Sequence, residues 1–256
     1  MKNPAPKNLK LRIPRFFSSY PLSESTEVSL PIETVVHAIK ALRLRENNKI
    51  MLFSGNGVEF EGVIKEVGTK QVIVTIGKSI VRSVESPIDI ILAQSLSRGD
   101  RMDYSIQKAT ELGANTVQPL QTERSMLKLD SARQIKRVQH WQKIAISACE
   151  QCGRNTIPTI NPPLKLSAWL NTLTLGADSH EKRLALVPDL DSMDRTGEPP
   201  KKITILIGPE GGFSQREIAN IQNKNFSTIK LGPRILRTET ACSAAISMLQ
   251  SIWGDF

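Results

Sequence analysis

The sequence predicts a two-domain protein in which a small N-terminal β-barrel precedes a layered α/β domain. The barrel is indicated by three short strand-like runs separated by turn-forming stretches, at residues 49–53, 58–65 and 71–76. From Ile88 onward, apolar strand-like runs alternate with helical patterns, which is typical of an α/β layer fold. We therefore expect a barrel domain over residues 1–82 and an α/β domain over residues 83–256.

The overall charge of the chain favours a polyanionic partner. Its 256 residues contain 34 Lys and Arg against 25 Asp and Glu, which gives a formal net charge of +9 at pH 7, and this balance favours nucleic acid as a partner. Residues 1–7 are basic but lack the apolar core of a signal peptide, and no apolar run reaches membrane-spanning length. With three cysteines and no secretory signal, we expect reduced thiols and a cytoplasmic location.

Basic side chains of the first domain are candidates for contacts with RNA. The run Arg12-Ile13-Pro14-Arg15-Phe16-Phe17 fits phosphate contacts by both arginines, and it also fits an edge strand whose arginines are only solvated. We expect the Phe side chains in the core and the Arg12 and Arg15 side chains at the RNA. Pro31 and the spacing of the apolar residues after it predict a helix whose other face adds Lys40 and Arg43 to these contacts.

The α/β domain begins with a strand-like run at residues 88–93. Asp100 can cap a helix that reaches Leu112, with Gly113 just past its end, and residues 116–120 form the next expected strand. A long helix is expected over residues 131–152. Its predicted packed side consists of Ile135, Val138, Trp141, Ile144, Ala145 and Ala148.

Cys149 and Cys152 have the spacing of a redox motif, but we assign them neither a redox nor a metal function. A thioredoxin-like pair lies near the start of a helix, where the helix dipole lowers the thiol pKa, whereas this pair ends the long helix. A zinc site needs four ligands, and the rest of the chain offers only Cys242 and three scattered histidines. We therefore expect no metal.

A first glycine-containing loop lies between a strand-like run and a helical segment. It is Gly208-Pro209-Glu210-Gly211-Gly212, and it follows the β-branched run at residues 203–207. Ser214 and Glu217 then have the spacing of a capping box, which predicts a helix start. The loop lacks the Lys-Ser or Lys-Thr of a Walker loop and the Gly-x-Gly-x-x-Gly pattern. By itself it fits a structural turn as well as a cofactor site.

A second loop of the same kind favours the cofactor site. It covers residues 232–240, after a strand-like run at 229–231 and before a helix from Ala241 to Trp253. Its end, Arg237-Thr238-Glu239-Thr240, puts a cation, a carboxylate and two hydroxyls at a helix start, which is more polar functionality than a turn requires. Because two such loops at neighbouring strand ends can form one pocket, we expect the ligand there.

The segments Leu206-Ile207-Gly208-Pro209-Glu210-Gly211-Gly212 and Leu231-Gly232-Pro233-Arg234-Ile235-Leu236-Arg237-Thr238-Glu239-Thr240 closely resemble the paired signature loops of the RsmE family. The resemblance covers nearly the whole chain, through residues 12–17, 122–125 and 150–154. Members of this family methylate N3 of one uridine in bacterial 16S ribosomal RNA with S-adenosylmethionine. They belong to the SPOUT superfamily, so the resemblance implies a trefoil-knotted, mainly parallel α/β methyltransferase domain after a PUA-like RNA-binding β-barrel.

The resemblance also implies which residues bind the cofactor. Residues 206–211 and 231–241 would supply the site, largely through backbone groups, with residues 184–188 at its rim. The expected cofactor-binding residues are Val187, Leu206, Ile207, Gly208, Glu210, Gly211, Leu231, Gly232, Leu236, Thr238, Glu239 and Ala241.

The implied chemistry needs positioning and a route for one proton, because S-adenosylmethionine already carries an activated methyl group. Uracil N3 attacks after losing its imide proton, and cations near O2 or O4 stabilise the resulting anion. We take Glu123 and Glu150 as candidates for the base. The candidates for stabilising the anion are Arg124, Arg154 and Arg237.

Two alternative functions stay open. A ribose 2′-O-methyltransferase of the same superfamily would share the cofactor loops, and a non-catalytic RNA-binding protein would have a decayed pocket. The resemblance, with the small residues Ala241, Ala244, Ala245 and Ser247 in the last helix, implies a homodimer. Since no residue set suits the reading of an extended sequence, we expect recognition of RNA shape and a displaced base, preferably in the assembled small subunit.

Overall fold

The computed structural model describes residues 13–31, 39, 43–125, 131–174, 180–187, 193 and 198–256. The chain forms two compact units. The first comprises Met1–Val84 together with Gly153–Thr156, and the second comprises Glu85–Cys152 and Ile157–Phe256. The short segment Gly153–Thr156 therefore belongs by its contacts to the first unit, although it lies in the middle of the sequence of the second.

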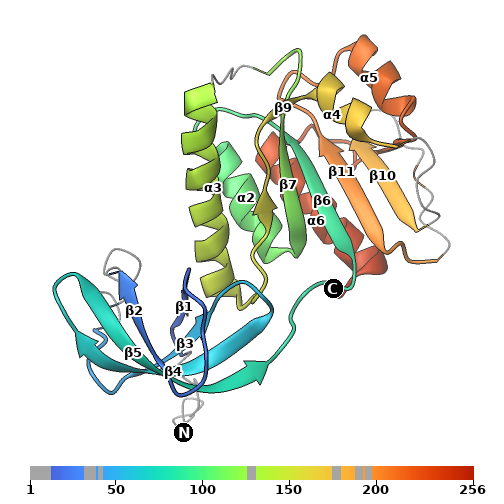
Figure 1. Ribbon diagram of the computed structural model, residues 1–256. Helices are drawn as coiled ribbons and strands as arrows, with labels where there is room; N and C mark the ends of the chain where they lie inside the picture. Colours follow the sequence, from blue (N-terminus) through green and yellow to red (C-terminus); the bar gives the residue numbers. More distant parts are fainter. Residues whose placement is uncertain are drawn as a thin grey trace, which may run out of the picture. The chain divides into compact units, whose positions relative to one another are not determined.

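The first unit is built on a five-stranded sheet with the strand order β1-β3-β4-β5-β2 (Figure 1). Its strands are β1 (Arg15–Phe17), β2 (Glu27–Pro31), β3 (Lys49–Phe53), β4 (Val58–Val67) and β5 (Gln71–Val81). β3, β4 and β5 form an antiparallel meander, β1 pairs with β3 in parallel, and β2 pairs with β5 antiparallel. The three predicted strands are confirmed, and β4 and β5 run further than expected. The helix predicted after Pro31 falls on residues 32–42, of which the structure describes only Ile39.

Alternation along these strands produces the core of the first unit. In β5, Val72, Val74 and Ile76 are buried while Thr75 is exposed, because successive side chains of a strand point to opposite faces. Phe16 joins the same cluster from β1, which confirms the core prediction for this side chain, whereas Phe17 is only half-buried. Register shifts between Phe60 and Gly62 bend the β4–β5 ribbon, as a β-bulge does.

The second unit contains a seven-stranded sheet in which every pairing between the described strands is parallel. The strand order is β12-β10-β11-β6-β7-β8, with β9 also paired to β7. These strands are β6 (Asp89–Ser95), β7 (Ala114–Gln121), β8 (Thr159–Ile160), β9 (Leu164–Lys165), β10 (Glu181–Leu186), β11 (Lys202–Ile207) and β12 (Ser227–Ile229). A buried parallel sheet explains why these segments read as continuous apolar runs.

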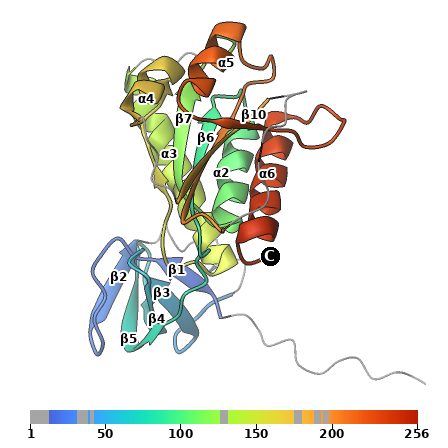
Figure 2. The same ribbon diagram turned by 90° about the vertical axis from the view of Figure 1, so that its right-hand side faces the viewer.

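Helices cover both faces of the parallel sheet (Figures 1 and 2). They are α2 (Arg101–Glu111), α3 (Ser131–Cys152), α4 (Leu166–Thr172), α5 (Gln215–Gln222) and α6 (Thr238–Trp253). Ile203, Ile205 and Ile207 of β11 pack in one cluster with side chains of α2, α3 and α6. Leu206 points to the opposite face and packs in a second cluster with side chains of α4 and α5. The predicted α/β layer fold is confirmed.

Four local predictions need correction. β12 lies two residues earlier than the expected strand at 229–231, and α6 begins at Thr238 rather than Ala241. Asp100 occupies the N-cap position of α2, but its side chain makes no capping hydrogen bond. Ile135 is 62% exposed, so it does not belong to the packed side of α3, where Trp141 and Ala145 are fully buried. Gly113 does follow α2 with a φ of 91°, a conformation that favours glycine.

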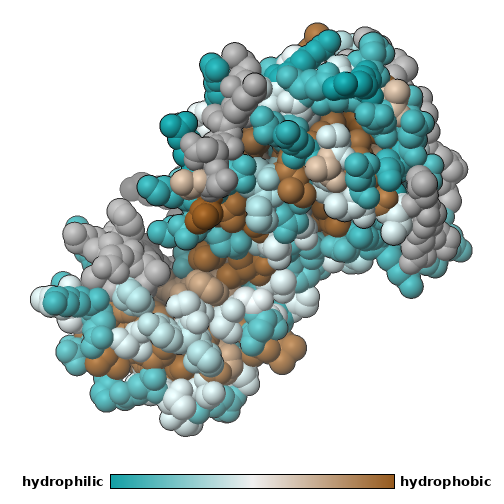
Figure 3. Space-filling view, turned by 45° about the horizontal axis from the view of Figure 1, so that its top comes forward, coloured by the Kyte–Doolittle hydropathy of each residue, from teal (hydrophilic) through white to brown (hydrophobic). Residues whose placement is uncertain are grey.

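The surface drawn in Figure 3 is mainly hydrophilic, with apolar residues gathered in patches. Among the described residues, the exposed large apolar side chains include Val81, Tyr104, Ile135 and Ile235. Within the part of the chain that the structure describes, none of the helices combines the length and the apolar character that crossing a membrane requires.

Candidate active site

The carboxyl ends of three parallel strands meet at one edge of the sheet. Leu186 at the end of β10 is in register with Ile207 of β11 on one side and with Ile229 of β12 on the other. The Val187 N–H extends this edge by donating to the Ile229 carbonyl oxygen at 3.3 Å. Ligands of open α/β sheets bind outside such carboxyl ends, so the segments that follow these strands form the expected place for a site.

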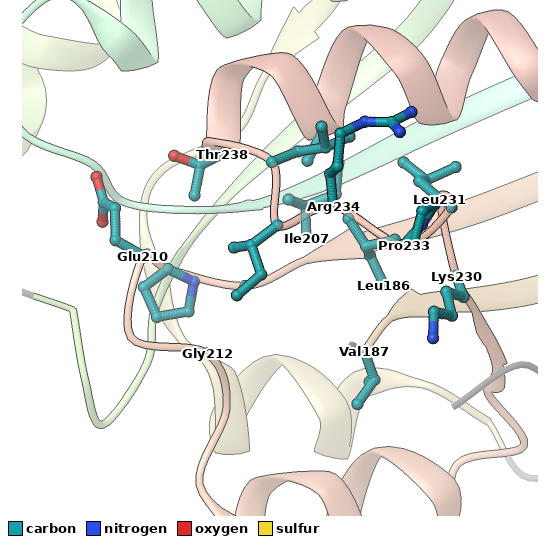
Figure 4. A pocket seen from close by; sticks show the side chains of 16 residues that line it. Leu186, Val187, Ile207, Glu210, Gly212, Lys230, Leu231, Pro233, Arg234 and Thr238 are labelled. Carbon is teal, nitrogen blue, oxygen red and sulfur yellow. The ribbon is translucent and has the colours of Figure 1, made fainter. Parts of the chain in front are cut away.

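A cavity of about 290 Å³ lies at this edge, between Val187 after β10 and the loops that follow β11 and β12 (Figure 4). Glu210 and Thr238 lie at one end of the cavity, and Val187 and Lys230 lie at the other. Its walls combine backbone of the two glycine-containing loops with apolar side chains such as Leu186 and Leu236. The prediction that the two loops form one pocket is confirmed.

Backbone conformation opens the cavity at two glycines. Gly212 and Gly232 have φ values of 67° and 75°, and no atom outside the adjacent residues lies within 4 Å of the position that a Cβ would take at either glycine. Such positive φ values are costly for other residues, so glycine leaves bare backbone facing the cavity. The helix after the first loop is fixed by the predicted capping box, in which Ser214 Oγ accepts from the Glu217 N–H at 3.1 Å and Glu217 Oε2 accepts from the Ser214 N–H at 2.9 Å.

The structure brings most of the predicted cofactor residues to this cavity. Those that line it are Val187, Ile207, Gly208, Glu210, Leu231, Gly232, Leu236, Thr238 and Ala241. Leu206 is instead buried on the other face of the sheet, and Glu239 lines a neighbouring cavity. Gly211 does not line the cavity either. It faces Arg124, because a Cβ added at Gly211 would lie 3.5 Å from the Arg124 side chain.

Two residues that line the cavity, Gly212 and Lys230, fall just outside the ranges that the resemblance implied, and Leu186, Arg234 and Ile235 lie inside those ranges but were not singled out individually. Each lies within or directly beside a segment already singled out. These residues could have been predicted by including every residue of each loop, because a loop that encloses a ligand contributes most of its residues to the cavity wall.

A second, more open cavity of about 960 Å³ lies beside the first, and Glu210 lines both. It is bordered by the segment Arg98–Arg101 at the start of α2 and by Arg237, Glu239 and Thr240 at the start of α6. Arg101 Nη1 donates to Glu210 Oε1 at 2.5 Å, which joins α2 to the first loop. Of the five predicted catalytic residues, Arg237 is the one that lines this cavity.

The loop that contains Glu123 and Arg124 supports the first glycine loop. Arg124 Nη1 donates to the Gly211 carbonyl oxygen at 2.7 Å, and the Glu123 N–H donates to Glu217 Oε1 at 2.8 Å. The Glu123 carboxylate accepts from Arg216 at 2.5 and 2.9 Å. A hydrogen bond from Ser214, followed by the contact with Arg216, holds the pKa of Glu123 below its ordinary value. These hydrogen bonds and the lowered pKa of Glu123 favour a positioning role for this loop.

Comparison with known proteins identifies the family. Residues 84–250 match the model of an RNA methyltransferase domain, and residues 33–77 match that of an RNA methyltransferase PUA domain. The ribosomal RNA small subunit methyltransferase E of Buchnera aphidicola subsp. Schizaphis graminum is 38% identical over 96% of this chain and 99% of its own length. The chain belongs to the ribosomal RNA small subunit methyltransferase E family.

Solved structures agree with this family. A protein from Legionella pneumophila, solved in complex with the bound cofactor SAM, has a TM-score of 0.89 and 36% identity, covering 96% of this chain and all of its own. The ribosomal RNA small subunit methyltransferase E of Neisseria gonorrhoeae, bound to S-adenosyl methionine, has a TM-score of 0.84 and 36% identity, covering 95% of this chain and 99% of its own. The SPOUT-type α/β knot fold with an N-terminal PUA-like domain, predicted from the loops, is confirmed.

In this member of the methyltransferase E family, Arg15 is part of the interior of the first unit. Its guanidinium forms an ion pair with Glu59, and the two side chains are only 7% and 4% exposed. Arg15 Nη2 also donates to Asn155 Oδ1 at 2.7 Å and to the Arg154 carbonyl oxygen at 3.1 Å. The structure thus gives Arg15 a structural role in place of the predicted phosphate contact.

The other predicted side chains lie apart from the two cavities or outside the described residues. Arg154 is buried in the first unit and Glu150 is half-buried near the end of α3, so neither lines a cavity at the strand ends. Arg12 and Lys40 lie outside the described residues, whereas Arg43 is exposed.

None of the three cysteines forms a disulfide within the chain. Cys149 and Cys242 are buried, and burial raises the pKa of Cys242 to about 12. In the part of the chain that the structure describes, no group of three or more His, Cys, Asp and Glu side chains is placed to hold a metal ion.

Proposed function

We propose that this protein transfers a methyl group from S-adenosylmethionine to N3 of a uridine in the ribosomal RNA of the small subunit. The observation that carries the proposal is the cavity of about 290 Å³ at the strand ends, formed by the two signature loops of the methyltransferase E family. Two similar proteins were solved with S-adenosylmethionine, and the related proteins are named for small subunit ribosomal RNA. The choice of uracil N3 follows from the resemblance of the loops to those of RsmE.

The cavity suits this cofactor in size and in chemistry. Its volume is near the lower end of the range for pockets that enclose small ligands. Leu186, Leu231 and Leu236 provide apolar walls for an adenine ring, and the open space at Gly212 and Gly232 lets polar edges of the ligand approach the backbone closely. When bound, S-adenosylmethionine supplies an activated methyl group, so the protein needs no nucleophile of its own.

The protein's own task is to place the uracil and stabilise its anion. We assign this stabilisation to Arg237, because a guanidinium near O2 or O4 favours the negative charge that develops there when N3 releases its imide proton to solvent in this open cavity. Arg237 lines the cavity beside the cofactor cavity, and the side chain of Glu210 lines both. Glu123 suits the role of base poorly, since its lowered pKa makes it a weak proton acceptor and Arg216 already holds its carboxylate.

We also propose that the protein acts as a cytoplasmic homodimer on the assembled small subunit. In α6, Ala241 and Ala245 are buried within the unit itself, whereas Ala244 and Ser247 are half-buried at its surface. Small side chains there would allow a helix of a second copy to approach closely. Sedimentation equilibrium at micromolar concentration tests this part, and a fully active monomer would exclude it.

Nucleoside analysis tests the reaction itself. Small subunits are purified from a strain that lacks this protein, incubated with the protein and labelled S-adenosylmethionine, digested and analysed by mass spectrometry. We expect N3-methyluridine, formed faster on assembled subunits than on naked RNA. A 2′-O-methylated nucleoside would replace the proposed acceptor, and a protein that binds S-adenosylmethionine without any transfer would be non-catalytic.

A further inference from the structure

The second cavity has the chemistry of a nucleotide site rather than of a solvent-filled groove. Three arginines, Arg98, Arg101 and Arg237, border it, and so does the Tyr104 ring, which is 45% exposed. An exposed aromatic ring in a cleft can stack against a base, and arginine suits phosphate because its planar fork matches two oxygens. These four side chains come from two helix starts that lie far apart in the sequence.

Both helices that begin at this cavity lack a side-chain cap. The N-cap residues of α2 and α6 are Asp100 and Arg237, which both line the cavity, and neither side chain accepts a capping hydrogen bond. By contrast, α5 has a complete capping box. The first N–H groups of a helix need an acceptor and carry a partial positive charge, so a phosphate between the two starts would be stabilised in addition to the carboxylate that each first turn already contains, Asp103 in α2 and Glu239 in α6.

Carboxylates balance the arginines around the cavity, which distinguishes a nucleotide from a simple anion. Asp100, Glu210 and Glu239 face the same space as the three arginines. Carboxylates repel a bare phosphate, but they accept hydrogen bonds from the N–H and O–H groups of a base and a ribose. The mixture therefore suits a ligand with a phosphate at one end and a hydrogen-bonding base at the other.

We propose that the second cavity holds the acceptor nucleotide of the RNA. Arg98, Arg101 and the two helix starts bind its phosphate, and Tyr104 contacts its base. The inference rests on the proposed function and specifies its substrate subsite, because Glu210 lines both this cavity and the cofactor cavity. The volume of about 960 Å³ leaves room for one nucleotide taken out of its stack, together with the adjoining backbone.

The Arg101–Glu210 ion pair can open when a ligand binds at the second cavity. The two side chains are 43% and 33% exposed, and ion pairs with that much water around them hold weakly. A phosphate can therefore compete with Glu210 for Arg101.

The test measures RNA binding separately from methyl transfer. A labelled single-stranded oligoribonucleotide containing the acceptor uridine is titrated into the full-length protein with saturating S-adenosylhomocysteine, at several salt concentrations. The variants are Arg98→Gln with Arg101→Gln, and Tyr104→Ala. The matched control is Lys201→Gln, an exposed cation beside the amino end of β11, at the edge of the sheet opposite the cavities.

We expect the double variant to bind the oligonucleotide at least tenfold more weakly and to reduce the slope of log K against log salt by about 1.4, the effect of losing two single-strand phosphate contacts. Tyr104→Ala should weaken binding without changing that slope. Affinity for S-adenosylhomocysteine should stay within about twofold of the wild type in every variant, because none of these residues lines the cofactor cavity.

Two results would overturn the inference. One is equal oligonucleotide affinity in the wild type, the double variant and Lys201→Gln, including the case in which the wild type shows no binding. The other is a parallel loss of S-adenosylhomocysteine affinity, which would assign these residues to the cofactor. If the wild type binds RNA through this cavity but methylates nothing, the proposed function fails and the nucleotide site stands.

Discussion

Removing Arg15 should destabilise the first unit far more than removing any exposed cation of the same unit. The Arg15 guanidinium lies 4.9 Å from the centre of the Phe53 ring, and it binds Glu59, Asn155 and the carbonyl oxygen of Arg154. Arg15→Ala deletes all of these contacts. It also leaves the Glu59 carboxylate, only 4% exposed, in a largely dry environment.

The burial of the pair sets the size of the effect. Removing one partner of a buried ion pair costs about 3–5 kcal/mol, because the remaining charge is left desolvated without compensation. One other cation is recorded near Glu59 in the described structure, Arg82 at 3.9 Å, and its side chain is 51% exposed. A half-exposed arginine at that distance recovers little of the loss, so we expect about 3–5 kcal/mol for Arg15→Ala.

Hydrogen exchange measured by mass spectrometry can resolve this effect by unit. All three tryptophans, Trp141, Trp169 and Trp253, belong to the second unit, so their fluorescence does not follow the first. Peptides from β3 to β5 should exchange roughly two to three and a half orders of magnitude faster in Arg15→Ala, unless the unit unfolds outright. The control is Lys65→Ala, which removes an ion pair to Glu27 whose side chains are 56% and 47% exposed and should cost less than about 1 kcal/mol.

A second substitution separates the uncompensated charge from lost packing. Glu59→Gln in the Arg15→Ala background removes the stranded carboxylate, so the double variant should be more stable than Arg15→Ala alone. If Arg15→Ala costs no more than Lys65→Ala, or if Glu59→Gln brings no recovery, the description of a buried and mutually dependent pair is wrong.

Three further predictions concern the second unit. Ile235 is 91% exposed yet lines the cofactor cavity, so Ile235→Ala should leave the melting temperature unchanged while weakening S-adenosylhomocysteine binding about tenfold by calorimetry, and unchanged affinity would remove it from the site. With a pKa of about 12, only ~10⁻⁴ of Cys242 is thiolate at pH 8, so native Cys242 should resist iodoacetamide that labels it quickly in urea. An NMR titration should place the pKa of Glu123 below its ordinary 4.5, and Ser214→Ala should raise it; a carboxylate that titrates normally in the wild type would refute the bracing described for this loop.

Local sequence patterns predicted much of the secondary structure correctly. Strand β3 and helix α3 have the predicted bounds. β3 is a continuous apolar run that is buried from Ile50 to Phe53, and the helical spacing of the apolar residues in α3 reflects which side of that helix is buried. β1 and β8 are three and two residues long, too short for any periodicity, and they exist because a neighbouring strand offers unpaired backbone groups. Ile135 has helical spacing but lies near the start of α3, where the structure leaves it 62% exposed.

The two parts of the candidate site differed in how far they could be predicted. Both loops could be recognised because their glycines and polar residues lie at strand ends, and their resemblance to the RsmE loops implied most of the residues that line the cofactor cavity. The second cavity joins Arg98 and Tyr104 to Arg237 and Glu239. No spacing in the sequence records that proximity, since it arises when α2 and α6 pack side by side on one face of the sheet. The predicted phosphate contact of Arg15 was wrong for a related reason, because its partners Glu59 and Asn155 are distant in sequence.

The return of Gly153–Thr156 to the first unit constrains how this protein is made and how it can be recombined. Asn155 binds Arg15 and also the carbonyl oxygen of Arg82, at 2.7 and 3.0 Å, and its own carbonyl oxygen accepts from the Gly57 N–H at 3.2 Å. During translation, strands β1 to β5 leave the ribosome well before Asn155 is synthesised. Until then the N-terminal unit lacks the hydrogen bonds that Asn155 makes with Arg15, Arg82 and Gly57. In a chimaera that takes only residues 1–84 from a relative, the segment 153–156 of the original protein would have to pack against the relative's first unit. Exchanging 153–156 together with 1–84 would restore the match.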